Sequence, residues 1–131
     1  YKYAFILLFC ISALVYMTGF AFANEITYIF NKDNIEELQK ISVNGIRLYF
    51  TAFIFAGYNI ITCVYFSAID KAKPSFIISI LRGFLLIMPS IFILSFLFKM
   101  TGVWISFTVS EFLTSIFSFI FFINFNKRKK Y

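Results

Sequence analysis

The chain has 131 residues, of which 61% are hydrophobic, 23% are aromatic and 14% are charged. A soluble domain contains about 45–50% apolar and about 25% charged residues, so this composition excludes an ordinary water-soluble domain and is typical of a membrane protein. The net charge of +6 does not indicate nucleic-acid binding, because the basic residues lie between and after apolar runs and not on a soluble face.

Four segments are long and apolar enough to cross a bilayer as helices, which takes about 20 residues each. They cover residues 4–23, 46–69, 74–98 and 103–125. The sequence therefore predicts an all-α, polytopic membrane protein with four transmembrane helices.

The first segment, residues 4–23, is expected to continue as a helix to Phe30. An alternative interpretation is a secretory signal, because Ala21–Ala23 has the small-x-small pattern of a cleavage site. The long apolar run and a charged region limited to Lys2 favour a transmembrane helix. Because residue 1 is Tyr and not Met, we expect a further part of the natural protein to precede the chain.

The main polar stretch lies between the first two segments. Asp33 and Glu36 have the spacing of a capping box, which predicts a helix start. Apolar residues then recur at helical spacing, at Ile35, Leu38 and Ile41. The pattern predicts an amphipathic helix over about residues 34–44, which lies near the membrane interface and runs into the second segment.

Two prolines fall in the third segment. Pro74 suits the first turn of a helix, where its missing N–H costs nothing. Pro89 lies inside the segment and predicts a kink. The short turn Lys99–Gly102 then leads into the fourth segment, so the third and fourth helices are predicted to be antiparallel neighbours.

The basic residues outside the apolar segments are unevenly distributed. One side of the predicted membrane carries Lys2, Lys71, Lys73, Lys127, Arg128, Lys129 and Lys130. The other side carries Lys32, Lys40, Arg47 and Lys99, offset by Asp33, Glu36 and Glu37. Because basic loops remain in the cytoplasm, both termini are predicted to be cytoplasmic.

Motifs of catalysis are missing from the sequence. The chain has no His, and Cys10 and Cys63 lie in separate apolar segments, so neither a metal site nor a disulfide is predicted. It has no nucleotide-binding loop, no Ser-His-Asp set and no pair of catalytic carboxylates. We therefore expect neither an enzyme nor a cofactor.

Two ionisable residues, Arg82 and Glu111, lie well inside predicted spans. A charge at the bilayer centre costs about 2.5–3.5 kcal/mol, so it normally faces protein or a water-filled cavity. Arg82 is alternatively long enough to reach the headgroups, whereas Glu111 is short and is the better functional candidate. Counting outward from the Lys99–Gly102 turn offsets the two residues by roughly 10 Å along the helix axes, so we do not expect them to pair.

The fourth segment has two faces when it is projected as a helix. The apolar face comprises Ile105, Val109, Phe112, Leu113, Ile116, Phe119, Ile120 and Ile123. The polar face comprises Thr108, Ser110, Glu111, Thr114, Ser115 and Ser118. Such a face indicates either helix packing through hydroxyl groups or the wall of an aqueous cavity. The carboxylate among the hydroxyl groups favours the cavity.

The second segment shows a similar division. Its polar face comprises Thr51, Tyr58, Asn59, Thr62 and Tyr65, and its apolar face comprises Phe50, Phe53, Ile54, Ile61 and Val64. Tyr and Asn side chains in a cavity bind aromatic or cationic solutes, and interhelical hydrogen bonding is an equally open explanation. The candidate residues that line a substrate cavity are therefore Tyr58, Asn59, Thr62, Tyr65, Thr108, Glu111 and Ser115.

Six short motifs follow one another from the start of the second segment onward. They are Arg47–Phe50, Phe55–Asn59, Lys71–Ser75, Ser79–Gly83, Gly102–Trp104 and Ser110–Phe112. In this order and spacing they resemble the end of a multidrug and toxic compound extrusion (MATE) transporter, helices nine to twelve. Asp70 and Ser67 depart from the glycine and glutamine common at those positions, which leaves the turn chemistry of that loop open.

The resemblance implies that residues 1–131 are part of a six-helix lobe, completed by N-terminal helices of the same transporter. Such transporters export cationic and aromatic drugs across the plasma membrane by alternating access, driven by entry of Na⁺ or H⁺. The implied partners are membrane lipid, the remaining helices, small organic cations or drugs, and Na⁺ or H⁺. Because the second segment has no carboxylate, assigning the coupling role to Glu111 is a hypothesis.

Two alternatives remain open at this point. A flippase for lipid-linked saccharides has a related architecture, but it needs more cationic groups than Arg82 to bind pyrophosphate. A membrane component that transports nothing and serves assembly is the other alternative. Hydroxyl groups packed dry against neighbouring helices would favour that component, and accessible ones would favour a transporter.

Overall fold

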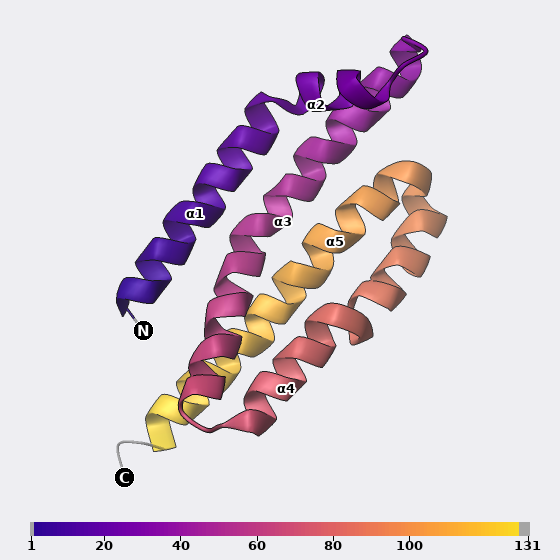
Figure 1. Ribbon diagram of the computed structural model, residues 1–131. Coiled ribbons are helices and arrows are strands. Elements are labelled where there is room, and N and C mark those ends of the chain that lie inside the picture. Colours follow the sequence, from indigo (N-terminus) through magenta and orange to yellow (C-terminus); the bar gives the residue numbers. More distant parts are fainter. Residues whose placement is uncertain (1, 129–131) are drawn as a thin grey trace.

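The computed structural model describes residues 2–128 and consists of helices joined by short loops, with no strand in this part of the chain (Figure 1). The elements are α1 (Lys2–Ala21), α2 (Ala23–Phe30), α3 (Glu36–Ala68), α4 (Ala72–Ile80), the π-helical turn η1 (Leu81–Leu85) and α5 (Ile87–Arg128). Lys129 and Lys130, counted above among the basic residues of the C-terminal end, lie outside the described residues. The prediction of an all-α chain is confirmed.

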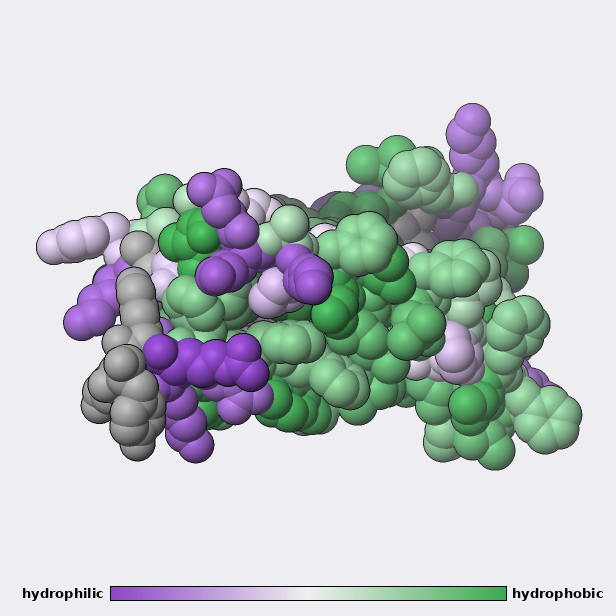
Figure 2. Space-filling model, turned by 90° about the horizontal axis from the view of Figure 1, so that it is seen from below, coloured by the Kyte–Doolittle hydropathy of each residue, from purple (hydrophilic) through white to green (hydrophobic). Residues whose placement is uncertain are grey.

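Three helical stretches of the described chain are long and apolar enough to cross a membrane. They are Lys2–Ala21, Glu36–Ala68 and Ala72–Arg128, the last of which comprises α4, η1 and α5. Large apolar side chains point away from the protein, as in Phe92 and Phe96, which are 72% and 89% exposed. Figure 2 shows hydrophobic surface across the middle of the molecule, with hydrophilic residues toward its two ends. This distribution is that of a membrane protein, because lipid accepts apolar surface that water would not.

The third stretch reverses its direction at Lys99, so that the arm before this residue and the arm after it run side by side (Figure 1). Lys99 has φ 53° and ψ −128°, and its neighbours on both sides remain helical. Gly102 lies against the main chain of the other arm, where an added Cβ would overlap the carbonyl group of Leu94. The predicted turn at Lys99–Gly102 is therefore present, and its tightness depends on glycine.

The long helix α3 occupies the centre of the molecule and packs against α1, α4 and α5. Ala52, Ala56 and Gly57 are buried, and such small residues let helices approach closely. A Cβ on Gly57 would overlap the Ser12 side chain of α1. Because α3 has neighbours on several sides, it buries Ile61 of its apolar face as well as Asn59 of its polar face.

The loop between α2 and α3 differs from the predicted capping box. The N-cap of α3 is Ile35, and no side chain caps this helix end. Asn31, which is 6% exposed, instead forms the side-chain hydrogen bonds that join the loop to the start of α3. Its amide nitrogen donates to the Ile35 carbonyl (3.0 Å) and to Gln39 Oε1 (3.2 Å), and its Oδ1 accepts from the Ile35 N–H (3.3 Å). The amphipathic segment is part of α3, as expected for a helix that runs into the second segment.

The predicted kink near Pro89 takes the form of a π-helical turn. Pro89 has no N–H to donate to the Leu85 carbonyl, and its ring crowds that carbonyl. The helix contains η1 just before this position, with a bond of 3.0 Å from the Leu86 N–H to the Leu81 carbonyl. Pro74 lies in the first turn of α4, as predicted. The turn η1 carries Arg82, so this irregularity positions the first of the two charges predicted inside the spans.

Candidate functional site

Glu111 lies in the second arm of α5 and faces α3, with only 1% of its surface exposed. The neighbours of Glu111 on the same helix face are buried as well, namely Ser106, Ser110, Thr114 and Ser118. The opposite face carries exposed apolar residues, including Phe112, Ile116, Phe119, Ile120 and Ile123. The predicted division of this segment is therefore confirmed: its polar side packs inside the protein.

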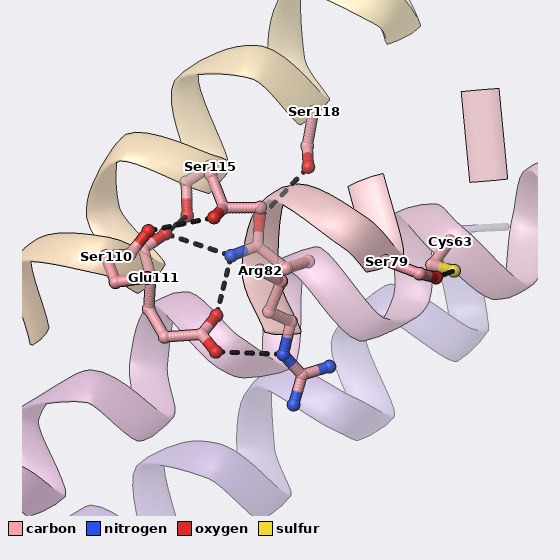
Figure 3. A network of polar contacts seen from close by, with 9 residues as sticks. Cys63, Ser79, Arg82, Ser110, Glu111, Ser115 and Ser118 are labelled. Atoms are coloured by element: carbon pink, nitrogen blue, oxygen red, sulfur yellow. Dashed lines mark hydrogen bonds and ion pairs between the residues drawn. The ribbon is translucent and has the colours of Figure 1, made fainter. Parts of the chain in front are cut away.

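Both oxygens of the Glu111 carboxylate accept a bond from another helical element (Figure 3). Arg82 Nε donates to Oε1 at 2.8 Å, and Asn59 Nδ2 donates to Oε2 at 2.8 Å. The same Asn59 amide lies 2.9 Å from the Glu111 carbonyl oxygen, and its Oδ1 accepts from Ser118 Oγ at 3.0 Å. This network joins α3, η1 and α5 through a single buried carboxylate.

The pairing of Arg82 with Glu111 corrects the expectation that their helical offset would keep them apart. That expectation counted residues along regular helices on both sides of the turn. In the structure Arg82 lies in a π-helical turn, which holds more residues in a given axial length and rotates the side chains that follow it. The long Arg82 side chain spans the remaining offset and is 34% exposed. The charges of Arg82 and Glu111 therefore neutralise each other.

A cavity of about 290 Å³ adjoins this ion pair. It is lined by Ser79, Arg82, Gly83, Ile87, Phe107 and Glu111. Its volume is near the lower limit of about 300 Å³ for small-molecule pockets. The cavity thus places a carboxylate, a guanidinium and an aromatic ring around a space too small for a large drug.

Of the seven predicted cavity-lining residues, Glu111 lines this cavity, while Asn59 and Ser115 belong to the same polar network. Ser115 Oγ donates to the Glu111 carbonyl at 2.9 Å. Thr108 Oγ1 donates to the Leu48 carbonyl of α3 at 2.7 Å, and Thr62 Oγ1 donates to the Tyr58 carbonyl of its own helix at 2.9 Å. These hydroxyl groups satisfy main-chain acceptors between or within helices.

The two predicted tyrosines lie elsewhere in the packing. Tyr58 contacts the ring of Phe5 in α1 edge-on, with centroids 5.9 Å apart. Tyr65 contacts Phe122 and Phe125 near the end of α5. The structure therefore brings Asn59, Arg82 and Glu111 together and places Tyr58 and Tyr65 in contacts with other helices.

The sequence analysis placed Ser118 on the polar face of the fourth segment but did not name it as a site residue. It did not name Ser79 or Phe107 as site residues either, although each has a helical signal. Ser79 precedes Arg82 by three positions, Phe107 precedes Glu111 by four, and Ser118 follows Glu111 by seven. These spacings place each residue on the same helix face as a predicted charge. Extending the faces of Arg82 and Glu111 by one helical turn toward the N-terminus would have located Ser79 and Phe107.

Two buried polar side-chain atoms have no hydrogen-bond partner in the described part of the chain. The Ser110 hydroxyl and Arg47 Nε are buried without a hydrogen bond there. The Arg47 guanidinium lies 4.8 Å from the centroid of the Phe20 ring, which places its positive charge against an aromatic face. Within residues 2–128, no group of three His, Cys, Asp or Glu side chains could hold a metal ion.

Comparisons with known family models, curated proteins and solved structures found no match to this chain. The resemblance to MATE transporters therefore stays a prediction that rests on the residues quoted above.

Proposed function

We propose that the chain is part of a cation-coupled exporter of cationic and aromatic compounds, with Glu111 as the site of the coupling cation. The observation that carries the proposal is a buried carboxylate, bonded by Arg82 and Asn59, inside helices suited to a membrane. A charged group at such a depth is costly and is typical of ion pathways and proton relays. The MATE resemblance supports the same class of activity.

We further propose that the chain crosses the membrane four times, with both termini in the cytoplasm. The two arms of the Ala72–Arg128 stretch, which meet at Lys99, would be the third and fourth crossings. In this arrangement the chain ends lie on one side, together with Lys71 and Lys73. The remaining helices of the lobe would cover exposed apolar side chains of the kind seen at Phe92 and Phe96.

Coupling follows from competition for the Glu111 carboxylate. Both of its oxygens are already bonded, so an incoming H⁺ or Na⁺ must replace Arg82 Nε or the Asn59 amide. Arg82 is 34% exposed and borders the cavity, so its guanidinium can move into the cavity when the cation binds to Glu111. Because a ligand shifts a conformational equilibrium only by its different affinity for the two states, this exchange is the step that drives alternating access.

The substrate site would extend beyond the cavity at the ion pair. Phe107 offers a ring face there, and Glu111 offers a negative charge once Arg82 has moved. A drug-sized compound needs more space than about 290 Å³, so the other lobe would provide the rest. The cavity offers an anionic pyrophosphate no unpaired cation, since the one guanidinium that lines it is already neutralised by Glu111.

The transport proposal is tested by dye efflux from cells that express the natural gene encoding this chain. We expect Glu111→Gln to lower ethidium efflux at least about tenfold, the factor that a coupling loss of 1.4 kcal/mol produces. Glu37→Gln is the matched control, because it makes the same chemical change at an exposed residue in the first turn of α3. Unchanged efflux in the Glu111 variant would remove this residue from coupling. If cells that express the unaltered protein export ethidium no faster than cells that lack it, the transport proposal is refuted.

A second function, a membrane component that transports nothing, is favoured by one observation. The hydroxyl groups of Thr62, Ser106 and Thr114 donate to carbonyl groups of their own helices and are fully buried. Such groups pack dry between helices and need no aqueous cavity. The same efflux experiment decides between the two functions, because this component would give no dye export in any variant.

The proposed topology is tested by labelling single cysteines with a maleimide that does not cross membranes. Met100 is 61% exposed beside the reversal at Lys99, and Asn126 is exposed near the end of α5. In a background of Cys10→Ala and Cys63→Ser, we expect Met100→Cys to react in intact cells. We expect Asn126→Cys to react only after the cells are permeabilised. Labelling of both positions from the same side would contradict four crossings.

A further inference from the structure

A second cavity, of about 730 Å³, lies where α3 ends, α4 begins and α5 ends. Its lining includes three basic residues, Lys71, Lys73 and Arg128, and three aromatic ones, Phe66, Phe121 and Phe125. We call it the basic pocket. The helix ends that line it lie at the end of the molecule where the two chain termini are marked, far along the bundle from the reversal at Lys99 (Figure 1).

The rim of the basic pocket has an excess of positive charge. Lys71, Lys73 and Arg128 form no ion pair within the described residues, and Asp70 is the one carboxylate among the lining residues. The α4 N-terminus adds to this charge, because no side chain caps it and its first turn has no acidic residue. Its first two N–H groups, at Ala72 and Lys73, have no preceding helical turn to accept them. Helix N-termini of this kind attract anions.

The interior of the basic pocket is aromatic. Phe66 is fully buried and contacts the Phe125 ring edge-on, with centroids 5.7 Å apart. Phe121 lies one helical turn before Phe125 in α5 and also lines the cavity. A small soluble anion needs only the charged rim. A rim of three cations above aromatic rings fits an amphiphile, whose anionic head meets the cations and whose carbon chain meets the rings.

We propose that the basic pocket binds the phosphate headgroup of an anionic phospholipid. Lys73 and Arg128, from different helices, donate to the phosphate oxygens together with Lys71, and the glycerol and first acyl carbons lie over Phe121 and Phe125. Basic residues at this end of the protein would favour its cytoplasmic orientation even if no lipid were bound. Orientation requires only the charges, however, and does not account for a cavity that joins them to an aromatic interior. Basic pockets between membrane helices are suited to such headgroups.

The test is a titration of the purified full-length protein, in a neutral detergent, with phosphatidylglycerol or phosphatidylcholine, followed by native mass spectrometry. We expect Lys73→Gln/Arg128→Gln to weaken phosphatidylglycerol binding about tenfold, since each charge-assisted bond is roughly twice as strong as a neutral one. Lys2→Gln/Lys127→Gln is the matched control, because it removes two charges from the same end of the protein but outside the pocket lining. We expect less than about a twofold change in the control.

Two further measurements make the outcome decisive. The charge-preserving pair Lys73→Arg/Arg128→Lys should retain binding, which separates lost contacts from a misfolded pocket. Inorganic phosphate and glycerophosphoglycerol, added as competitors, distinguish a lipid from a free phosphate. Competition by inorganic phosphate at equal concentration would overturn the lipid assignment. Equal losses in the pocket and control variants, or equal binding of the two phospholipids, would overturn the site itself.

Discussion

Replacing Arg82 with Gln is expected to cause a larger loss of stability than the same change at most other charged positions. The substitution leaves the Glu111 carboxylate, which is 1% exposed, without its cation. Removing one member of a buried ion pair costs about 3 kcal/mol or more, because the remaining charge stays out of water. We expect a clear fall in the thermal unfolding midpoint of the full protein in detergent. Lys32→Gln, at an exposed lysine that lines neither cavity described above, is the control and should change little.

The size of the loss of stability depends on which partner of the ion pair is removed. Glu111→Gln should cost less than Arg82→Gln, because the Arg82 side chain is 34% exposed and can turn toward polar surroundings. The double variant Arg82→Met/Glu111→Met should regain most of the lost stability, since apolar residues often replace a buried pair without penalty. It should nevertheless export no dye if the proposed coupling is correct. Equal stability of the unaltered protein and Arg82→Gln would show that the pair contributes nothing to folding.

Replacing Gly102 with Ala is the second change with a large expected effect. The added Cβ would overlap the Leu94 carbonyl group and lie 2.9 Å from the Ser95 nitrogen, and main-chain atoms cannot rotate away. Overpacking of this kind costs about 1–3 kcal/mol and sometimes more. We expect the hairpin at Lys99 to open or the whole protein to unfold at a lower temperature. A lower midpoint of thermal unfolding in detergent is the measurement.

Gly83 provides the matched control for this substitution. Nothing lies within 4 Å of a Cβ built on it, although it is also a glycine inside the third helical stretch. Gly83→Ala should therefore leave stability unchanged or raise it slightly, because Ala favours helix over Gly by about 1 kcal/mol. If both variants unfold alike, the close approach at Gly102 is not what holds the two arms together.

The positions of the helices and the faces that they bury were predictable, because both follow from the hydropathy of the sequence and from the spacing of apolar residues along a helix. Runs of apolar residues placed the helices, and the fourth segment divided correctly into an exposed apolar side and a buried polar side with Glu111 at its centre. Pro74 marked a helix start, as its missing N–H allows. These features depend on a residue and its neighbours three or four positions away, which sequence patterns record directly.

The partners of these residues were harder to predict because they depend on tertiary packing. A regular helix carries Arg82 past Glu111, and only the π-helical turn with a long side chain restores the contact. The predicted capping box at Asp33 is absent, and Asn31 forms side-chain hydrogen bonds to Ile35 at the start of α3 instead. Tyr58 and Tyr65 of α3 contact aromatic rings of α1 and α5, and the spacing of residues within α3 does not predict these contacts. Interhelical distances of this kind are not encoded in local spacing.

The extra residue in η1 has a consequence for the whole first arm of the hairpin. Before it, the buried residues Ser75, Ile78 and Leu81 follow a regular spacing of three positions. A regular helix would next bury Phe84 or Leu85, yet these residues are 61% and 55% exposed, and the following residue, Leu86, is half-buried instead. One inserted residue turns a helix by about 100°, so the arm consists of two half-helices whose lipid-facing stripes are out of phase. A single helical wheel drawn across residues 72–98 therefore mixes two surfaces, and each half must be aligned with its own neighbours.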